Sequence, residues 1–194
     1  MLTILHFLPQ MLQGVLLTMM VLICALALGL MLSFLFTFCL ERQVNRYLSY
    51  LIHIYLFIFR GTPTLVQIFI IYYGAGQISL IRYSFLWQAF KQPFFCAVLA
   101  LGLNTAAYTT ALFTGAIRAI PRGEIQAGIA LGFNNVALYQ KIIIPRLFSI
   151  ILPAYSNEVV MVLKSTSLVS AITLPELTGV TQTIIGQTYM TSGL

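Results

Sequence analysis

Long apolar stretches alternate with short polar intervals along this chain, and the apolar stretches have the length of membrane-spanning helices. Residues 11–40 hold no charged residue, and residues 93–117 and 147–163 are largely apolar. About 20 apolar helical residues cross a bilayer core of ~30 Å. The pattern therefore predicts three helical spans over these ranges.

A further apolar stretch, residues 47–73, is interrupted by Arg60-Gly61-Thr62-Pro63. Backbone groups freed at such an interruption are tolerated only against protein or a water-filled cavity. We therefore expect a fourth, broken span. Residues 74–92 contain aromatic and basic residues typical of a membrane interface. Within the span at 93–117, two rows of small residues at four-residue spacing favour close helix packing in a bundle: Gly102, Ala106, Thr110 and Ala111, Gly115, Ala119.

Composition supports a membrane protein, since 60% of residues are apolar and 7% are charged, against roughly a quarter charged in soluble domains. The net charge of +6 does not indicate nucleic acid, because the basic residues stand singly or in pairs. Basic residues concentrate on one side of the spans: Arg42, Arg46, Arg118, Arg122, Lys141 and Arg146. Arg82 and Lys91 lie on the other. The bias predicts an external N-terminus and a cytoplasmic 118–146 loop.

The 118–146 loop has the pattern of two short helices. Pro121 suits a first helical turn, Glu124 complements the helix dipole and Gly132 is placed to end the helix. Asn134 or Asn135 can cap a second helix, which we expect to end before Pro145. Such a knob fits docking into a groove on another protein, and the alternative is a hairpin lying on the bilayer.

Three motifs carry a resemblance to a known family. Gly123 to Gly128, then Gly132-Phe133 and Ile144-Pro145, look like the Glu-Ala-Ala loop of ABC importer permeases. The Arg60 to Pro63 motif, the stretch 153–158 and the stretch 164–168 resemble the polar amino acid branch, especially histidine and arginine permeases.

The resemblance implies an all-α polytopic bundle of the type I ABC importer permease kind, forming one transmembrane domain over residues 1–194, with 118–146 as a coupling loop. It implies that ATPase contacts come from Gln126, Ala127, Gly128, Gly132 and Phe133. Partners would be ABC ATPase subunits, a second permease, a periplasmic amino-acid-binding protein and membrane lipid. Localisation would be the bacterial inner membrane.

Two features depart from the family pattern. Gln126-Ala127-Gly128 stands where the family has Glu-Ala-Ala, which loses a charge and adds a flexible residue at about 1 kcal/mol. Family members continue into a fifth span after the segment matching Tyr189, so we expect four clear spans and a missing fifth.

Chemistry on this chain is not expected. It has no phosphate loop and no nucleophile, base and orienter set, so no catalytic or metal site and no cofactor is predicted, and ATP and Mg²⁺ would belong to the ATPase. Glu158 is the only acidic residue within a predicted span. An ionisable group at that depth faces a partner or a wet cavity.

Two partners are open for Glu158: Arg60 near Thr62 at the break, or a cationic substrate. The resemblance favours the substrate. Lys164, about 120° around the helix from Glu158, should not pair with it. Asn157 is more easily explained as a helix-to-helix hydrogen bond than as a ligand contact.

The leading hypothesis is a permease that imports polar, by preference basic, amino acids of the arginine, histidine or lysine type with energy from ATP. An ion-gradient-driven secondary transporter is one alternative. It should show two related sets of interrupted spans, and none is visible in the sequence. A non-transporting membrane scaffold is the other, and it would leave Glu158 and the knob without a transport role.

Overall fold

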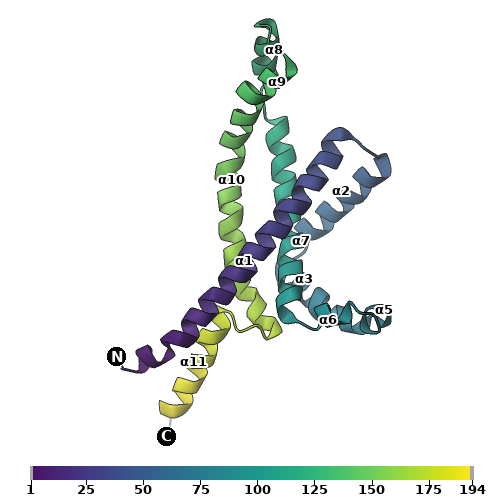
Figure 1. Ribbon diagram of the computed structural model, residues 1–194. Coiled ribbons are helices and arrows are strands. Elements are labelled where there is room, and N and C mark those ends of the chain that lie inside the picture. The colour runs from purple at the N-terminus through teal and green to yellow at the C-terminus, as the bar shows by residue number, and fades with distance from the viewer. Residues whose placement is uncertain (1, 193–194) are drawn as a thin grey trace.

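Three long helices form the framework of the molecule. The structure is a computed structural model that describes residues 2–192, with side chains from residue 7 to 188. The three helices are α1 (Leu2–Arg42), α7 (Pro93–Arg118) and α10 (Ile144–Ser165). Figure 1 shows α1 crossing α7, with α10 alongside. No strand occurs among the described residues. This agrees with the predicted all-α bundle.

The segments Phe7–Arg42, Pro93–Arg118 and Asn135–Ile172 are long and apolar enough to span a membrane. A fourth candidate is the pair Arg46–Gly61 and Thr64–Gln77, bent by 110°. These correspond to the four predicted spans. The predicted single domain includes residues 1, 193 and 194, which lie outside the described residues. The prediction of a missing fifth span depends on the sequence after Tyr189, whose side chains lie outside the described part as well.

The helix packing of α1 against α7 depends on two glycines. A Cβ atom at Gly29 would lie 2.0 Å from the Thr105 methyl carbon, and one at Gly102 would lie 2.7 Å from Leu28 Cδ2. Small residues let the two helices approach this closely. The predicted row from Gly102 to Thr110 is buried, but the second row is not, since a Cβ at Gly115 would meet nothing within 4 Å.

The predicted break is present after α2 (Arg46–Gly61), at Thr62 and Pro63. The chain then continues through α3 (Thr64–Phe69), a π-helical turn η1 (Ile70–Gly74) and α4 (Ala75–Gln77). Two short helices, α5 (Ser79–Arg82) and α6 (Trp87–Phe90), lead to α7. They occupy the predicted interface segment.

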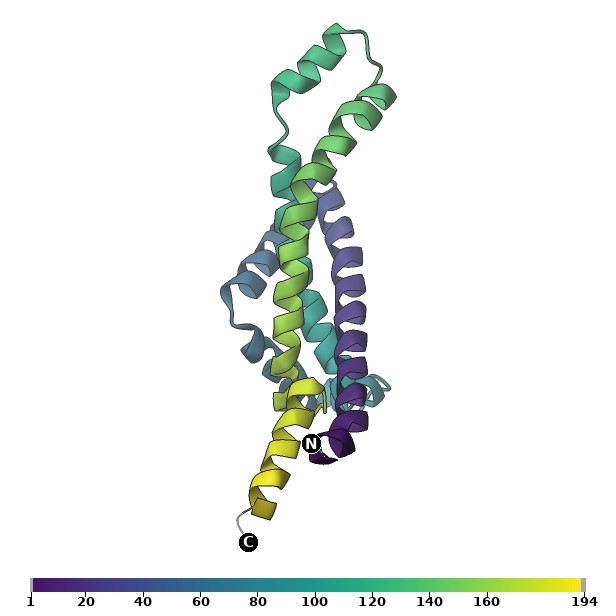
Figure 2. The ribbon, with the colours of Figure 1, turned by 90° about the vertical axis from the view of Figure 1, so that its left-hand side faces the viewer.

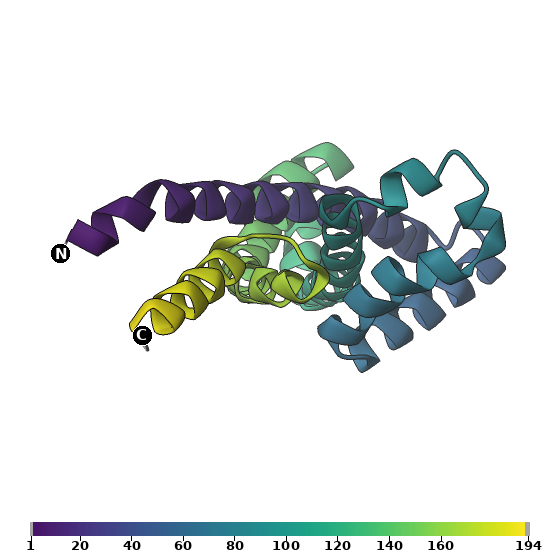
Figure 3. The same cartoon turned by 90° about the horizontal axis from the view of Figure 1, so that it is seen from below.

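At its C-terminal end, α10 passes into a 3-10 turn η3 (Thr166–Ile172), and α11 (Leu177–Ser192) returns along the N-terminal part of α1. Figure 3 shows α11 and the start of α1 extending in the same direction. The buried core, which includes Val21, Ile68, Leu101 and Ile172, joins α1, α3, α7 and η3. Thus the core lies at the end of the bundle nearer the N-terminus.

At the other end, α8 (Arg122–Ala130) and α9 (Asn135–Leu138) form a knob that projects beyond α1 and α7 (Figure 2). The prediction that the second knob helix ends before Pro145 was wrong. From α9 the chain stays helical through a π-helical turn, η2 (Tyr139–Ile143), into α10. The Ile144 amide donates to the Tyr139 carbonyl, five residues back. This wider turn gives the chain an alternative to the α-helical bonding that proline disrupts.

Candidate functional site

Glu158 lies on α10 where that helix packs against α7. Thr105 Oγ1 donates a hydrogen bond of 2.8 Å to Glu158 Oε1. The side chain is only partly buried. Within the described chain Glu158 forms no ion pair and no second hydrogen bond, so its other carboxylate oxygen remains available.

Arg60 does not pair with Glu158 among the described residues. Its guanidinium lies 5.7 Å from the centre of the Tyr108 ring, and the Tyr108 hydroxyl donates to the Arg60 carbonyl at 3.4 Å. Arg60 is exposed. Tyr108 and Thr105 are three residues apart on α7, about 4.5 Å along the helix axis. The acid and the arginine therefore approach α7 at similar depth but contact different residues.

Thr62 forms part of a hydrogen-bonded brace across the helix break. Gln67 Nε2 lies 2.8 Å from the Phe59 carbonyl and 2.8 Å from Thr62 Oγ1. Asn104 on α7 donates to Gln67 Oε1 at 3.0 Å. Thr62 Oγ1 donates to the Ile58 carbonyl at 2.8 Å. The brace satisfies backbone groups freed at the break and ties the broken span to α7.

Asn157 and Lys164, the other polar residues considered on α10, are both exposed in the isolated chain. Neither pairs with Glu158 within the described residues, as expected for Lys164 from its angle around the helix. Asn157 makes no hydrogen bond through its side chain in the described chain. It is therefore available to a group outside the chain.

The knob turns at Gly132, as predicted. Gly132 has φ +79°, and its amide donates to the Ile129 carbonyl at 2.9 Å. The next amide, of Phe133, donates to the Gly128 carbonyl at 3.0 Å. These two bonds are those of a Schellman motif, which favours glycine at the left-handed position. Asn134, and not Asn135, caps the second helix by accepting from the Ala137 amide at 2.8 Å.

Gly128, the departure from the family triplet, lies at a tightly packed position. It is buried, and a Cβ atom there would lie 2.7 Å from Ile142 Cδ1. Arg146 also donates to Glu124 at 2.9 Å, and Lys141 lies 5.3 Å from the centre of the Phe133 ring. These contacts fix α8 against the start of α10.

The outer surface of the knob includes polar and apolar side chains. Gln126, Ala127 and Gly132 are exposed, and Phe133 is partly buried. Ile129 is 60% exposed and Leu131 is 75% exposed. Large apolar side chains left this open form a surface suited to contact with another protein.

Sequence reasoning missed Thr105, Gln67 and Asn104, which hold Glu158 and the broken span in place. Gln67 and Asn104 are amide side chains within apolar stretches, which is the signal that singled out Asn157. Thr105 gave no such signal, because threonines in transmembrane helices commonly bond their own backbone.

Comparisons with known proteins agree with this architecture. Residues 25–194 match the family model described as binding-protein-dependent transport system inner membrane component. A crystal structure of an amino acid ABC transporter with histidines has a TM-score of 0.81 and 26% identity, covering 97% of this chain and 83% of that one.

Curated relatives are more similar in sequence. The octopine transport system permease protein of Rhizobium meliloti is 44% identical over 92% of this chain and 72% of its own length. The arginine ABC transporter permease protein of Escherichia coli K12 is 51% identical, over 73% of this chain and 64% of the relative. The nopaline permease of Agrobacterium fabrum is 45% identical over 75% of this chain and 61% of that protein. This chain therefore belongs to the family of binding-protein-dependent transport system inner membrane components, which are multi-pass permease subunits and not enzymes.

Proposed function

We propose that this chain forms half of the translocation path of an ATP-driven importer for polar, by preference basic, amino acids. The observation that carries the proposal is the Glu158 carboxylate on α10, held by one hydrogen bond from Thr105 with its second oxygen available. In a partly dry passage a carboxylate attracts a cation more strongly than it does in water. The relatives named for octopine, nopaline and arginine support a basic substrate.

Arg60 and Thr62 are proposed as further residues along the path. Both are exposed at the helix break, where a polar solute would find backbone and side-chain groups together. Gln67 donates a hydrogen bond to Thr62. We therefore propose that Thr62 holds the shape of the helix break beside the path and does not move with the substrate. Asn157 is proposed to bond across to another helix.

The assembly we propose contains a second permease, two ABC ATPase subunits and a periplasmic binding protein. The face of α10 that carries Asn157 supports the second permease, because Val160 and Met161, one turn further along that face, are 47% and 53% exposed. The knob over residues 118–146 is proposed to dock on the ATPase through Gln126, Ala127, Gly128, Gly132 and Phe133. ATP and Mg²⁺ would be bound by the ATPase, with the knob in the cytoplasm and the N-terminus outside.

Changing Glu158→Gln tests the substrate role. Uptake of arginine or histidine should fall more than uptake of glutamine, measured per molecule of inserted permease. Glu176→Gln is the matched control, because Glu176 is buried and both its oxygens cap the start of α11. The control should lower the abundance of the inserted permease, and so reduce total uptake of every substrate by the same factor. The same uniform loss for Glu158→Gln would leave that residue structural.

Reconstituted transport distinguishes the energy sources. In proteoliposomes containing the purified complex and binding protein, uptake should require ATP on the side of the membrane where the knob lies. It should continue when an ionophore collapses the ion gradients. Uptake that needs the gradient and ignores ATP would favour a secondary transporter. No uptake under either condition, from a correctly assembled complex, would favour a scaffold.

A further inference from the structure

The ends of α1, α2 and α7 enclose a cavity of about 1040 Å³, at the knob end of the bundle. Arg46 at the start of α2 and Arg118 at the end of α7 both line it, together with Asn45, Tyr47 and His53. It is separate from the contacts of Glu158 and from the brace at the helix break. The proposed translocation path gives it no role.

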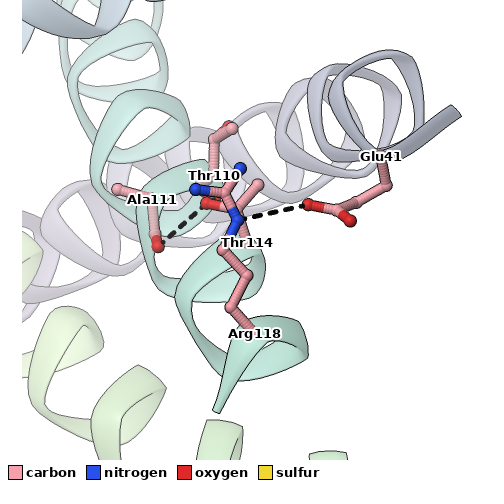
Figure 4. Close-up of polar contacts among 5 residues, drawn as sticks. All are labelled: Glu41, Thr110, Ala111, Thr114 and Arg118. Atoms are coloured by element: carbon pink, nitrogen blue, oxygen red, sulfur yellow. Dashed lines mark hydrogen bonds and ion pairs between the residues drawn. The ribbon is translucent and has the colours of Figure 1, made fainter. Parts of the chain in front are cut away.

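The cavity carries excess positive charge. Arg118 is 71% exposed, and its Nε lies 3.9 Å from Glu41 Oε1, at the outer limit of an ion pair. Figure 4 shows these two side chains extending toward each other from α7 and α1. No acidic residue lies among the lining residues or in the first turn of α2. Two arginines therefore line the cavity with one carboxylate, that of Glu41, beside it, and the positive end of the α2 dipole adds to the same potential.

The depth of the cavity favours a lipid. The two uninterrupted spans beside it end at Arg42 and Arg118, so the cavity lies at the boundary between hydrocarbon and water. Tyr47 is 82% exposed and Tyr50 is 67% exposed, and tyrosine at this depth sits among the headgroups.

We propose that this cavity binds the headgroup of an anionic phospholipid, with the phosphate between Arg46 and Arg118. Guanidinium groups bind phosphate oxygens with directed, charge-assisted hydrogen bonds, and basic pockets between transmembrane helices are suited to acidic lipid headgroups. The inference rests on the membrane placement of the chain and not on its substrate.

Native mass spectrometry of the assembled permease, titrated with phosphatidylglycerol against phosphatidylcholine of the same acyl chains, tests the site. The wild type should retain phosphatidylglycerol preferentially. Arg46→Gln or Arg118→Gln should each weaken that binding about fivefold, and the double change about thirtyfold. Arg82→Gln removes the same charge from exposed α5 at the other end and should change nothing.

Charge-preserving variants and a phosphate arm complete the test. Arg46→Lys with Arg118→Lys should keep most of the preference, since the point charges remain. Inorganic phosphate at millimolar concentration should not displace the lipid. The proposal fails if both lipids bind equally, if the double Gln variant retains the preference, or if free phosphate binds as well as the lipid with the same arginine dependence. Lipid retention is measured without any transport assay. A failure of this test therefore leaves the proposed function untouched, and a failure of the transport tests leaves this proposal untouched.

Discussion

At the scale of single residues, Glu158 and Glu176 show how the surroundings of a carboxylate decide whether it is fully used in holding the fold or has an oxygen available. Glu176 is 2% exposed, and its two oxygens accept from the Thr178 and Gly179 amides. Glu158 shares only one oxygen, with Thr105. The sequence distinguishes them by depth in a span, but only the structure shows which oxygen is already used.

Gly29→Ala should disturb the Glu158 contact from the opposite side of Thr105. The new methyl group would lie 2.0 Å from Thr105 Cγ2, so either the helices separate or Thr105 rotates and its hydroxyl leaves Glu158. We expect a clear fall in melting temperature of the purified permease and reduced uptake. Gly115→Ala is the control, because nothing lies within 4 Å of its Cβ. Equal stability of the two variants would contradict this packing.

Gln67→Leu should weaken the brace at the helix break. The change removes the donor to Phe59 and Thr62 and the acceptor of Asn104, at about 1–2 kcal/mol of unfolding free energy. A double-mutant cycle with Asn104→Ala in detergent measures the pair directly, and the combined loss should be smaller than the sum of the single losses. Strict additivity would mean that the two amides do not act together. Gln88→Leu, at an exposed position of α6, serves as control.

At the scale of elements, the knob shows what sequence can predict and where it fails. Gly132 and Glu124 were placed correctly because helix ends depend on local residues. The helix end predicted before Pro145 was wrong, because a π-helical turn accommodates the proline and no residue type predicts such a turn. The brace was missed because Gln67 and Asn104 meet across 37 positions of sequence, a pairing that only tertiary structure creates.

Gly132→Asp should uncouple ATP hydrolysis from uptake while the protein still inserts. A side chain at φ +79° costs about 1–2 kcal/mol and would alter the bend between α8 and α9. The measurement is ATPase activity and uptake in the same proteoliposomes. Gly123→Asp adds the same charge to exposed backbone at the start of α8, with nothing within 4 Å, and should remain coupled. Normal transport by the Gly132 variant would argue against docking through this bend.

At the scale of the whole molecule, the distribution of basic residues predicts one orientation in the membrane. The N-terminus and the knob lie at opposite ends of the bundle (Figure 1). Arg42, Arg46 and Arg118 are at the knob end, whereas Arg82 follows the broken span toward the other end. The orientation stays a prediction, and it depends on counts of basic residues and not on contacts.

Cysteine labelling in intact cells checks this orientation. In a background without Cys24, Cys39 and Cys96, Tyr83→Cys should react with an impermeant maleimide, because Tyr83 is 86% exposed at the end away from the knob. Gly123→Cys in the knob should react only after the membrane is permeabilised. The reverse pattern would invert the topology and remove the docking role of the knob.

The π-helical turn at Tyr139–Ile143 also fixes the rotation of α10 about its axis relative to α9, because α9, η2 and α10 form one continuous helical rod. A π turn places one extra residue in the rod, and each residue of an α-helix advances it by about 100°. Deleting a single residue there would rotate everything beyond it relative to the knob. Gly128 could then keep its contact with Ile142, or Thr105 its bond to Glu158, but not both. The turn thus sets the angle between the knob, which we propose as the ATPase-docking surface, and the Glu158 carboxylate on α10.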